Sequence, residues 1–294
     1  MSELISITRG QAATKGDLGY GSTAKPNNRA PFARAVVAVT SGKGGVGKST
    51  VAANLAVGLA QRGLQVGVLD ADVYGPSIPR LLSVETERLE WNDQNQMVPA
   101  ENFGVKIVSV ALTTPDKDTP LAWRSSVATS ALVQLLEDVA WGPLDVLFVD
   151  MPPGTGDVQL TMAQELPLAM CVVVTTPQTL ATDDVRRAIR MMQEIKTPLA
   201  LIENMSFFVA PDTGHTYHPF GQGGGRMLAD EYRVPLLGEL PLDVTVREAC
   251  DAGRPIIAMG DDQQKQAYRA VVDALLQQPS LHAKLARETG SANP

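Results

Sequence analysis

The 294-residue sequence is short of several features that would define its compartment and its partners. It has only two cysteines, Cys171 and Cys250, which lie far apart and form no C-x-x-C pair. Isolated cysteines of this kind favour buried free thiols over a disulfide or a redox motif. The N-terminus lacks the apolar core of a signal peptide, and no apolar run reaches the length of a membrane span. We therefore expect a cytoplasmic protein with no membrane partner.

Positive charge is scarce as well. The chain has 25 Lys and Arg against 32 Asp and Glu, a formal net charge of −7, and no block of basic residues. This pattern argues against nucleic acid as a main partner. With 44% hydrophobic and 19% charged residues, the composition is that of a globular protein with a sizeable core.

One glycine-rich turn stands out from this ordinary composition. Residues 42–50 read Gly-Lys-Gly-Gly-Val-Gly-Lys-Ser-Thr and fit the pattern G-x-x-x-x-G-K-[ST]. An apolar segment suited to a buried strand precedes the turn at residues 35–39, and residues 50–62 follow with helical spacing. Glycines let backbone N–H groups point at an anion, and a helix N-terminus adds partial positive charge. The sequence therefore predicts a nucleoside triphosphate site instead of a simple surface turn.

The two lysines of this turn have different predicted roles. Lys48 is placed to reach the β- and γ-phosphates, and the Ser49 hydroxyl is placed to ligate Mg²⁺. Lys43 is not needed to hold the phosphates of its own subunit. It is either a solvated loop charge or a residue that reaches a phosphate on a facing subunit, as a trans-acting arginine does.

Strand and helix patterns alternate from residue 35 onward. Strands are predicted at residues 35–39, 66–70, 105–110, 146–150, 170–175, 199–204 and 235–240. Helices are predicted at residues 50–62, 127–139, 181–195, 225–232, 243–252 and 263–277, with a short one near Leu81. This alternation is typical of an α/β fold with a mainly parallel sheet and helices on both faces. We expect one P-loop ATPase domain over residues 35–280, a disordered leader over 1–34 and a flexible tail over 281–294.

Aspartates follow two of these strands, at the edge where ligands bind an open parallel sheet. Asp150 has the form of a Walker B acid that holds Mg²⁺ directly or through water. The loop after it places the Gly154 amide to sense the γ-phosphate, the alternative being a turn with an acidic helix cap at Asp157. Asp72 is the candidate that orients or deprotonates the attacking water, and Asp70 supports Mg²⁺ through water. Either of the last two could instead cap the following loop.

At these motifs the chain resembles the Mrp/ApbC-type P-loop ATPases, iron–sulfur cluster carriers of the MinD/ParA class with a deviant Walker A (SIMIBI) turn. The resemblance rests on residues 42–50, 70–77, 150–160, 173–178, 203–206 and 238–243. It implies a homodimeric ATPase that delivers iron–sulfur clusters to apoproteins. It also implies that Lys43 contacts nucleotide across the dimer interface, that the Asn204 amide reads the adenine edge, and that residues 241–243 lie beside the base.

The candidate site residues are therefore of three kinds. The nucleotide-binding set is Gly42, Lys43, Gly44, Gly45, Val46, Gly47, Lys48, Ser49, Thr50, Gly154, Asn204, Pro241 and Asp243. The catalytic set is Lys43, Lys48 and Asp72, and the Mg²⁺ set, direct or through water, is Ser49, Asp70 and Asp150. The expected cofactors are ATP and Mg²⁺.

The sequence departs from the family at the cluster site. The cluster-carrying form of the family has a C-P-x-C pair after the asparagine strand, bridging one cluster across the dimer. Here Ala210 and Thr213 stand at the two cysteine positions. Iron–sulfur clusters are held by thiolates, so we identify no iron–sulfur ligand. His215 and His218 form an H-x-x-H pair that could ligate a metal, but polar loop histidines are the interpretation we favour.

Two functions fit these observations. The first is an ATP-driven homodimeric switch in iron–sulfur cluster or related metallocofactor assembly, with an apoprotein or assembly protein as partner. The second is a scaffold or adaptor ATPase that recruits a protein partner without carrying a cluster. A MinD-like membrane organiser would need a C-terminal amphipathic helix, and residues 281–294 have few large apolar side chains. A small-molecule kinase would need an acceptor site, for which the sequence gives no candidate.

Overall fold

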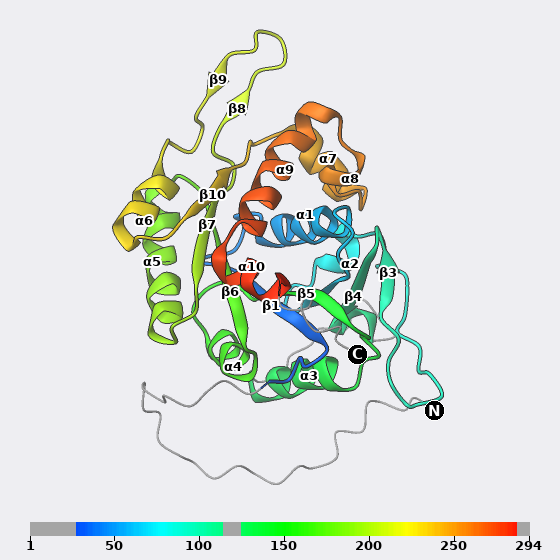
Figure 1. The fold of residues 1–294 in the computed structure, drawn as a ribbon. Helices are drawn as coiled ribbons and strands as arrows, with labels where there is room; N and C mark the ends of the chain where they lie inside the picture. The colour runs from blue at the N-terminus through cyan, green and yellow to red at the C-terminus, as the bar shows by residue number, and fades with distance from the viewer. Residues whose placement is uncertain (1–27, 114–124, 287–294) are drawn as a thin grey trace.

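The computed structural model describes residues 28–113 and 125–286. Its centre is an eight-stranded sheet with the order β10-β7-β6-β1-β5-β2-β4-β3 (Figure 1). All neighbouring strands run parallel except the edge strand β3, which pairs antiparallel with β4. The mainly parallel α/β fold predicted from the strand–helix alternation is confirmed.

The strands of the sheet are β1 (Ala33–Ser41), β2 (Val66–Asp70), β3 (Ala100–Asn102), β4 (Val105–Ser109), β5 (Leu144–Asp150), β6 (Leu168–Thr175), β7 (Leu199–Glu203) and β10 (Leu236–Glu239). A separate hairpin consists of β8 (Phe208–Val209) and β9 (Thr216–Tyr217). The helices are α1 (Lys48–Ala60), α2 (Ile78–Leu81), α3 (Ser125–Glu137), α4 (Asp157–Glu165), α5 (Thr179–Glu194), α6 (Gly224–Tyr232), α7 (Val244–Asp251), α8 (Ile256–Met259), α9 (Asp262–Leu276) and α10 (Pro279–Leu285), with a 3₁₀ turn at Val110–Leu112. The elements predicted from the sequence are present, whereas β3, α4, α8, α10 and the hairpin were not predicted.

Helices cover both faces of the sheet. On one face α1, α2, α8, α9 and α10 contribute to a core that includes Val37 and Val39 of β1. On the other face α3, α4, α5 and α6 pack over Val36 and Ala38 of the same strand. Successive side chains of a strand point to opposite faces, so a strand covered on both sides must be apolar throughout. This requirement explains the near-continuous apolar runs of the sequence.

Order extends beyond both predicted ends of the domain. β1 begins at Ala33, and Arg29 before it forms ion pairs with Glu137 and, at 2.8 Å, with Glu165. At the other end α10 continues to Leu285, and Leu281 is fully buried. The flexible tail predicted over residues 281–294 is therefore wrong for residues 281–285. Leu281 and Leu285 lie one helical turn apart and attach this segment to the core. Residues 1–27 of the predicted leader and 287–294 of the predicted tail lie outside the described residues.

Truncating the buried leucine of α10 tests this attachment. We expect Leu281→Ala to lower the free energy of unfolding by about 2–5 kcal/mol, the usual cost of emptying a core leucine site. His282→Ala, an exposed change on the same helix, should alter it by less than about 0.5 kcal/mol. Urea unfolding of both variants measures the difference. Equal stabilities would mean that α10 adds nothing to the core.

Candidate functional site

The carboxyl ends of β1, β2 and β5 meet at one edge of the sheet. Asp70 at the end of β2 lies opposite Asp150 at the end of β5, and Asp150 also lies opposite Val39 of β1. The glycine turn leaves β1 at the same edge, directly after Ser41. Three segments far apart in the sequence therefore converge where ligands bind a parallel sheet.

The glycine turn ends at Gly47, and α1 begins at Lys48. Gly47 has a φ of 81°, in the left-handed region that favours glycine. Space is limited there too, because an added Cβ would lie 2.3 Å from Nδ2 of Asn204. The Asn204 amide donates a hydrogen bond of 2.8 Å to the carbonyl of Val46. A side chain at position 47 would therefore displace Asn204 from the turn.

Lys48 is buried, and oxygen atoms of three side chains lie near its ammonium group. Its Nζ lies 2.7 Å from Oδ1 of Asp150, 3.9 Å from Oδ2 of Asp72 and 3.1 Å from the Ser49 hydroxyl. The Ser49 hydroxyl in turn donates to Oδ2 of Asp150 at 2.5 Å. The ammonium thus offsets the charge of carboxylates that would be costly to bury alone.

Asp70 is fully buried behind this ion pair and holds the start of α2. Its Oδ2 accepts hydrogen bonds from the amides of Ser77 at 3.0 Å and Ile78 at 3.1 Å, and its Oδ1 accepts one from the Asp72 amide at 3.2 Å. Asp70 therefore caps the segment that leads into α2, one of the two roles predicted for it. Burial and the neighbouring Asp150 raise the pKa of Asp70 to about 8. Burial also raises the pKa of Asp150 and of partly buried Asp72.

These oxygen atoms are of the kind that Mg²⁺ prefers. The Ser49 hydroxyl and the Asp150 carboxylate are already adjacent, at 2.5 Å. After burial, the charge of Asp150 is the main cause of the raised pKa of Asp70, and a cation placed among these carboxylates would offset that charge. The residues present therefore fit a Mg²⁺ ion.

The loop after β5 is folded back along the end of β1. The Met151 amide donates to the Val39 carbonyl at 2.9 Å, and the Gly154 amide donates to the Ser41 carbonyl at 2.9 Å. Gly154 has a φ of 94°, which favours glycine at this position. The amide predicted to sense the γ-phosphate is thus occupied by a carbonyl of the protein. It must leave Ser41 before it can bind a phosphate.

A cavity of about 330 Å³ opens beside the glycine turn. Its lining residues are Ser41, Lys43, Gly44, Gly45, Gly47, Lys48, Ser49, Thr50, Asp72, Ser77, Arg80, Leu81, Pro153, Cys250 and Asp251. The wall of the cavity opposite the glycine turn is formed by α2 and the end of α7, and no sequence motif predicts it. Arg80, Cys250 and Asp251 belong to no phosphate-binding motif, and only the fold brings α7 to the turn.

Lys43 lies at the wall of this cavity and is half exposed. Its ammonium forms no ion pair with any residue in the described part of the chain, in contrast to Lys48. The side chain is therefore available to an anion in the cavity or to one on a facing subunit.

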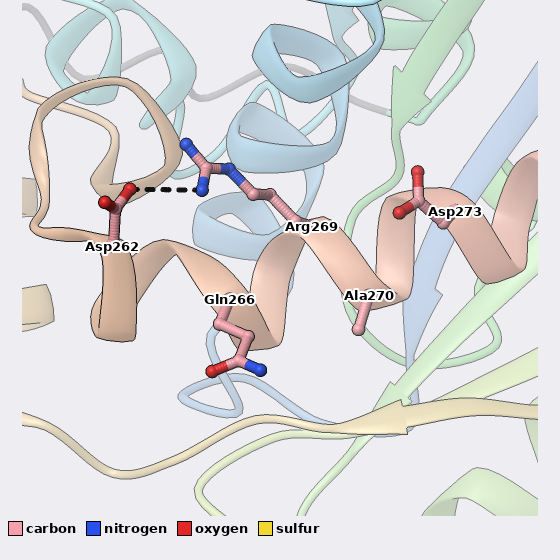
Figure 2. A pocket seen from close by; sticks show the side chains of 5 residues that line it. All are labelled: Asp262, Gln266, Arg269, Ala270 and Asp273. Atoms are coloured by element: carbon pink, nitrogen blue, oxygen red, sulfur yellow. Dashed lines mark hydrogen bonds and ion pairs between the residues drawn. The ribbon is translucent and has the colours of Figure 1, made fainter.

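A second hollow, of about 560 Å³, lies along α9 (Figure 2). It is lined by Asp262, Gln266, Arg269, Ala270 and Asp273. Arg269 is held by Asp262 at 3.3 Å, and Asp273 forms an ion pair with Arg62. All five lining residues belong to α9, and none of them is a glycine. The smaller cavity at the glycine turn is therefore the candidate nucleotide site.

The residues expected beside the base lie apart from the phosphate cavity. The Asn204 amide is hydrogen-bonded to the Val46 carbonyl of the glycine turn. Asp243 caps α7 by accepting a hydrogen bond of 2.7 Å from the Thr245 amide. Pro241 follows Leu240, whose amide donates to the Glu203 carbonyl at 2.8 Å. The ends of β7 and β10 thus hold Asn204 and the 241–243 segment near each other, and neither lines the cavity.

The β8–β9 hairpin carries Ala210 and Thr213 in its loop and projects from the body of the molecule (Figure 1). The Ala210 amide donates to the His215 carbonyl at 2.9 Å, which closes the loop. Alanine and threonine side chains offer no thiolate here. The two positions at which the resemblance predicts cysteines therefore bring no iron ligand to the hairpin.

The two histidines of the hairpin do not converge on one point. His215 packs edge-on against Tyr217 with ring centroids 4.7 Å apart, whereas Nδ1 of His218 lies 3.1 Å from the Ser206 carbonyl. Among residues 28–113 and 125–286, neither histidine belongs to a group of three or more His, Cys, Asp or Glu side chains that could hold a metal ion. The two imidazole rings thus have separate contacts within the protein.

Both cysteines are free thiols, as predicted. Cys171 is fully buried in β6, and burial raises its pKa to about 12. Cys250 is only half-buried, and its Sγ lies 3.8 Å from Oγ1 of Thr50 at the wall of the cavity. Cys250 is thus the more accessible thiol, and it lies next to the candidate nucleotide site.

Comparison with known proteins gives the family. The sequence profile described as "ParA: NUBPL iron-transfer P-loop NTPase" matches residues 33–276. The chain belongs to this family. It is 51% identical over 253 residues to the iron–sulfur cluster carrier protein of Deinococcus radiodurans, covering 85% of this chain and 71% of that protein. It is 43% identical over 245 residues to the Escherichia coli iron–sulfur cluster carrier protein, covering 83% and 66% respectively.

Solved structures agree with this assignment. An ADP complex of a nucleotide-binding protein from Archaeoglobus fulgidus superposes with a TM-score of 0.67 at 38% identity, covering 76% of this chain and 88% of that one. The cell division ATPase MinD of Pyrococcus furiosus shares the fold, with a TM-score of 0.60 at 21% identity, covering 82% and 98%. Within the described ranges, no helix has the length and apolar character needed to cross a membrane. The chain is an ATP-binding P-loop NTPase of the iron–sulfur cluster carrier family, as its motifs predicted.

Thiol labelling can locate the nucleotide. Saturating ADP should slow the alkylation of Cys250 by iodoacetamide, because this thiol lines the cavity beside the glycine turn. Cys171 should stay unreactive with and without ADP, since it is fully buried. Peptide mass spectrometry after timed reaction measures both rates in one sample.

The Lys48→Ala variant serves as the control for this experiment, because ADP should no longer protect Cys250 once the ammonium predicted to bind its phosphates is gone. A Cys250 rate that ADP leaves unchanged in the wild-type protein would place the nucleotide elsewhere.

Proposed function

We propose that this chain is an ATP-hydrolysing homodimeric switch that acts in iron–sulfur cluster assembly, and that its nucleotide state gates cluster transfer or partner binding. One observation carries the proposal: Lys48, Ser49, Asp72 and the glycine turn line a single cavity with Asp150 directly behind them. The relatives named above as iron–sulfur cluster carrier proteins support the biological setting.

In this proposal the backbone amides of residues 42–50 and the Lys48 ammonium bind the phosphates of ATP. Ser49 and Asp150 hold Mg²⁺ directly or through water, and Asp70 supports it through water. Bound Mg²⁺ neutralises charge on the phosphates. Lys48 turns from Asp150 toward the phosphates, since it now lies 2.7 Å from that carboxylate.

Asp72 is the residue that orients or deprotonates the attacking water. Its carboxylate lies at the cavity wall, 3.9 Å from the Lys48 ammonium, and is less buried than Asp70 or Asp150. Partial burial raises its pKa, which makes it a better proton acceptor than an exposed aspartate.

The remaining contacts complete the nucleotide site. The Gly154 amide exchanges the Ser41 carbonyl for the γ-phosphate. Asn204, Pro241 and Asp243 border the base, with the Asn204 amide released from Val46. Lys43, which has no ion-pair partner among the described residues, reaches the nucleotide of a facing subunit.

A second candidate function follows from the hairpin residues at the expected cluster site. Ala210 and Thr213 supply no thiolate, and Val209 and Tyr217 of the same hairpin are 41% and 51% exposed. This observation favours a scaffold or adaptor ATPase whose nucleotide-dependent dimer recruits a protein partner. The two candidates share the nucleotide chemistry and differ in whether the chain itself holds a cluster.

Subunit mixing tests the role of Lys43 in trans. Lys43→Ala and Asp72→Ala should each abolish ATP hydrolysis while nucleotide binding stays measurable. In a mixed dimer, the Lys43→Ala subunit keeps its own Asp72 and receives Lys43 from the other subunit, so one intact site forms. Turnover should therefore reappear when the two inactive variants are mixed, as measured by phosphate release. A mixture as inactive as its components, or an active Lys43→Ala protein, would contradict the trans assignment.

Anaerobic reconstitution with iron and sulfide tests the cargo. Because cluster ligation needs thiolates, the wild-type dimer should retain no cluster by absorbance and metal counting, an outcome that excludes direct carriage by this chain and leaves the nucleotide-gated binding of a partner. The double variant Ala210→Cys with Thr213→Cys restores the family's cysteine pair and should retain one. Stoichiometric cluster on the wild-type chain would instead identify it as a direct carrier and exclude the adaptor alternative.

A further inference from the structure

Gln159 is a polar side chain that the nucleotide chemistry above leaves unused. It lies in the first turn of α4 and is fully buried. Its Nε2 donates a hydrogen bond of 3.2 Å to Oγ1 of Thr40 and another to the carbonyl of Pro152. Its Oε1 has no hydrogen-bond partner among the described residues. An unpartnered buried acceptor costs about 1–3 kcal/mol, so a simple core role does not explain this glutamine.

The loop that Gln159 holds has a rigid first part and a pliable second part. Met151 is fixed to Val39 by its amide, and the two prolines that follow have restricted φ angles and no N–H to donate. Gln159 fixes the carbonyl of Pro152. Gly154, at a φ of 94°, is the first residue after this rigid part with freedom to turn.

The same loop borders the candidate nucleotide site. Pro153 lines the cavity, and the Gly154 amide is hydrogen-bonded to Ser41, the last residue of β1 before the glycine turn. Thr40, the second partner of Gln159, is the neighbour of Ser41. Gln159 therefore joins α4, the loop and the end of β1 at a single buried point.

We propose that Gln159 is a positioning residue for γ-phosphate sensing. By fixing Pro152 and Thr40, it provides a fixed point about which the loop turns. The Gly154 amide then moves between the Ser41 carbonyl and the γ-phosphate. This inference rests on the proposed ATP hydrolysis and assigns it a residue that does not touch the nucleotide. The unpartnered Oε1 leaves an acceptor for a loop N–H displaced by the swing. This acceptor explains why a glutamine is buried at position 159, although an apolar side chain would also fill the space.

The effect should be confined to nucleotides with a γ-phosphate. ADP has no γ-phosphate, and the hydrogen bonds of Gln159 go to Thr40 and Pro152, not to the glycine turn or Lys48. Without its pivot, the loop would present the Gly154 amide in many positions, and misplacement by about 1 Å can lower a rate by up to about 100-fold. The expected signature is a lower kcat with unchanged ADP affinity, which a purely structural role would not produce.

The experiment compares four full-length proteins. Gln159→Met removes the amide and keeps the length of the side chain, and Gln164→Met makes the same change at an exposed position of α4. Thr40→Val removes the second partner of Gln159 from the β1 side, which keeps the test decisive if Gln159→Met does not fold. For these and the wild type we measure kcat and KM for ATP, the Kd of ADP, and thermal stability.

We expect kcat to fall about ten-fold in Gln159→Met and less in Thr40→Val, with KM for ATP and Kd of ADP within about two-fold of wild type. Gln164→Met should match the wild type. Folded variants with wild-type kcat, or with ATP and ADP binding weakened together, would overturn the assignment of Gln159 alone. A wild-type protein that binds ADP but never hydrolyses ATP would overturn the proposed function and this inference with it.

Discussion

The ion pair between Lys48 and Asp150 lies buried where β1, β5 and α1 meet, and the rest of the site is arranged around it. Removing one partner of such a pair leaves a bare charge in the interior, at a typical cost of about 3–5 kcal/mol. Ser49 hydrogen-bonds to the same carboxylate, and Asp72 faces the same ammonium. Asp70 lies beside them, and its raised pKa of about 8 reflects burial and the charge of Asp150. The cluster is stable only because Lys48 offsets this concentration of negative charge.

Groups that a nucleotide would contact are thus already satisfied by the protein. The Lys48 ammonium is paired with Asp150, the Gly154 amide with the Ser41 carbonyl, and the Asn204 amide with the Val46 carbonyl. Nucleotide binding in the proposed function is therefore an exchange of partners. Each exchange frees a segment that is connected to another part of the molecule. Release of Gly154 frees the loop after β5, which Gln159 joins to α4. Release of Asn204 frees the residue that precedes the β8–β9 hairpin. In the proposed function, a change at the phosphates can in this way reach the hairpin.

The sequence was sufficient to predict the sheet, its main helices and the convergence of the turn with Asp70, Asp72 and Asp150, because these features follow from local pattern and from the geometry of parallel strands. Short elements such as α10 were missed, since they depend on tertiary contacts of one or two side chains such as Leu281. The far wall of the cavity, with Arg80 and Cys250, was missed because residues distant in sequence form it. Gln159 was visible within the motif after Asp150, but no spacing rule reveals that its partners are Thr40 and Pro152.

In the proposed switch, ATP and not ADP brings two copies of this chain together. The most direct test is the solution mass of an Asp72→Asn variant, which should bind ATP without consuming it, measured by light scattering in the presence of Mg²⁺ with ATP or with ADP. We expect the mass to shift from monomer toward dimer with ATP and to show no such shift with ADP. The same mass in both nucleotide states would contradict it.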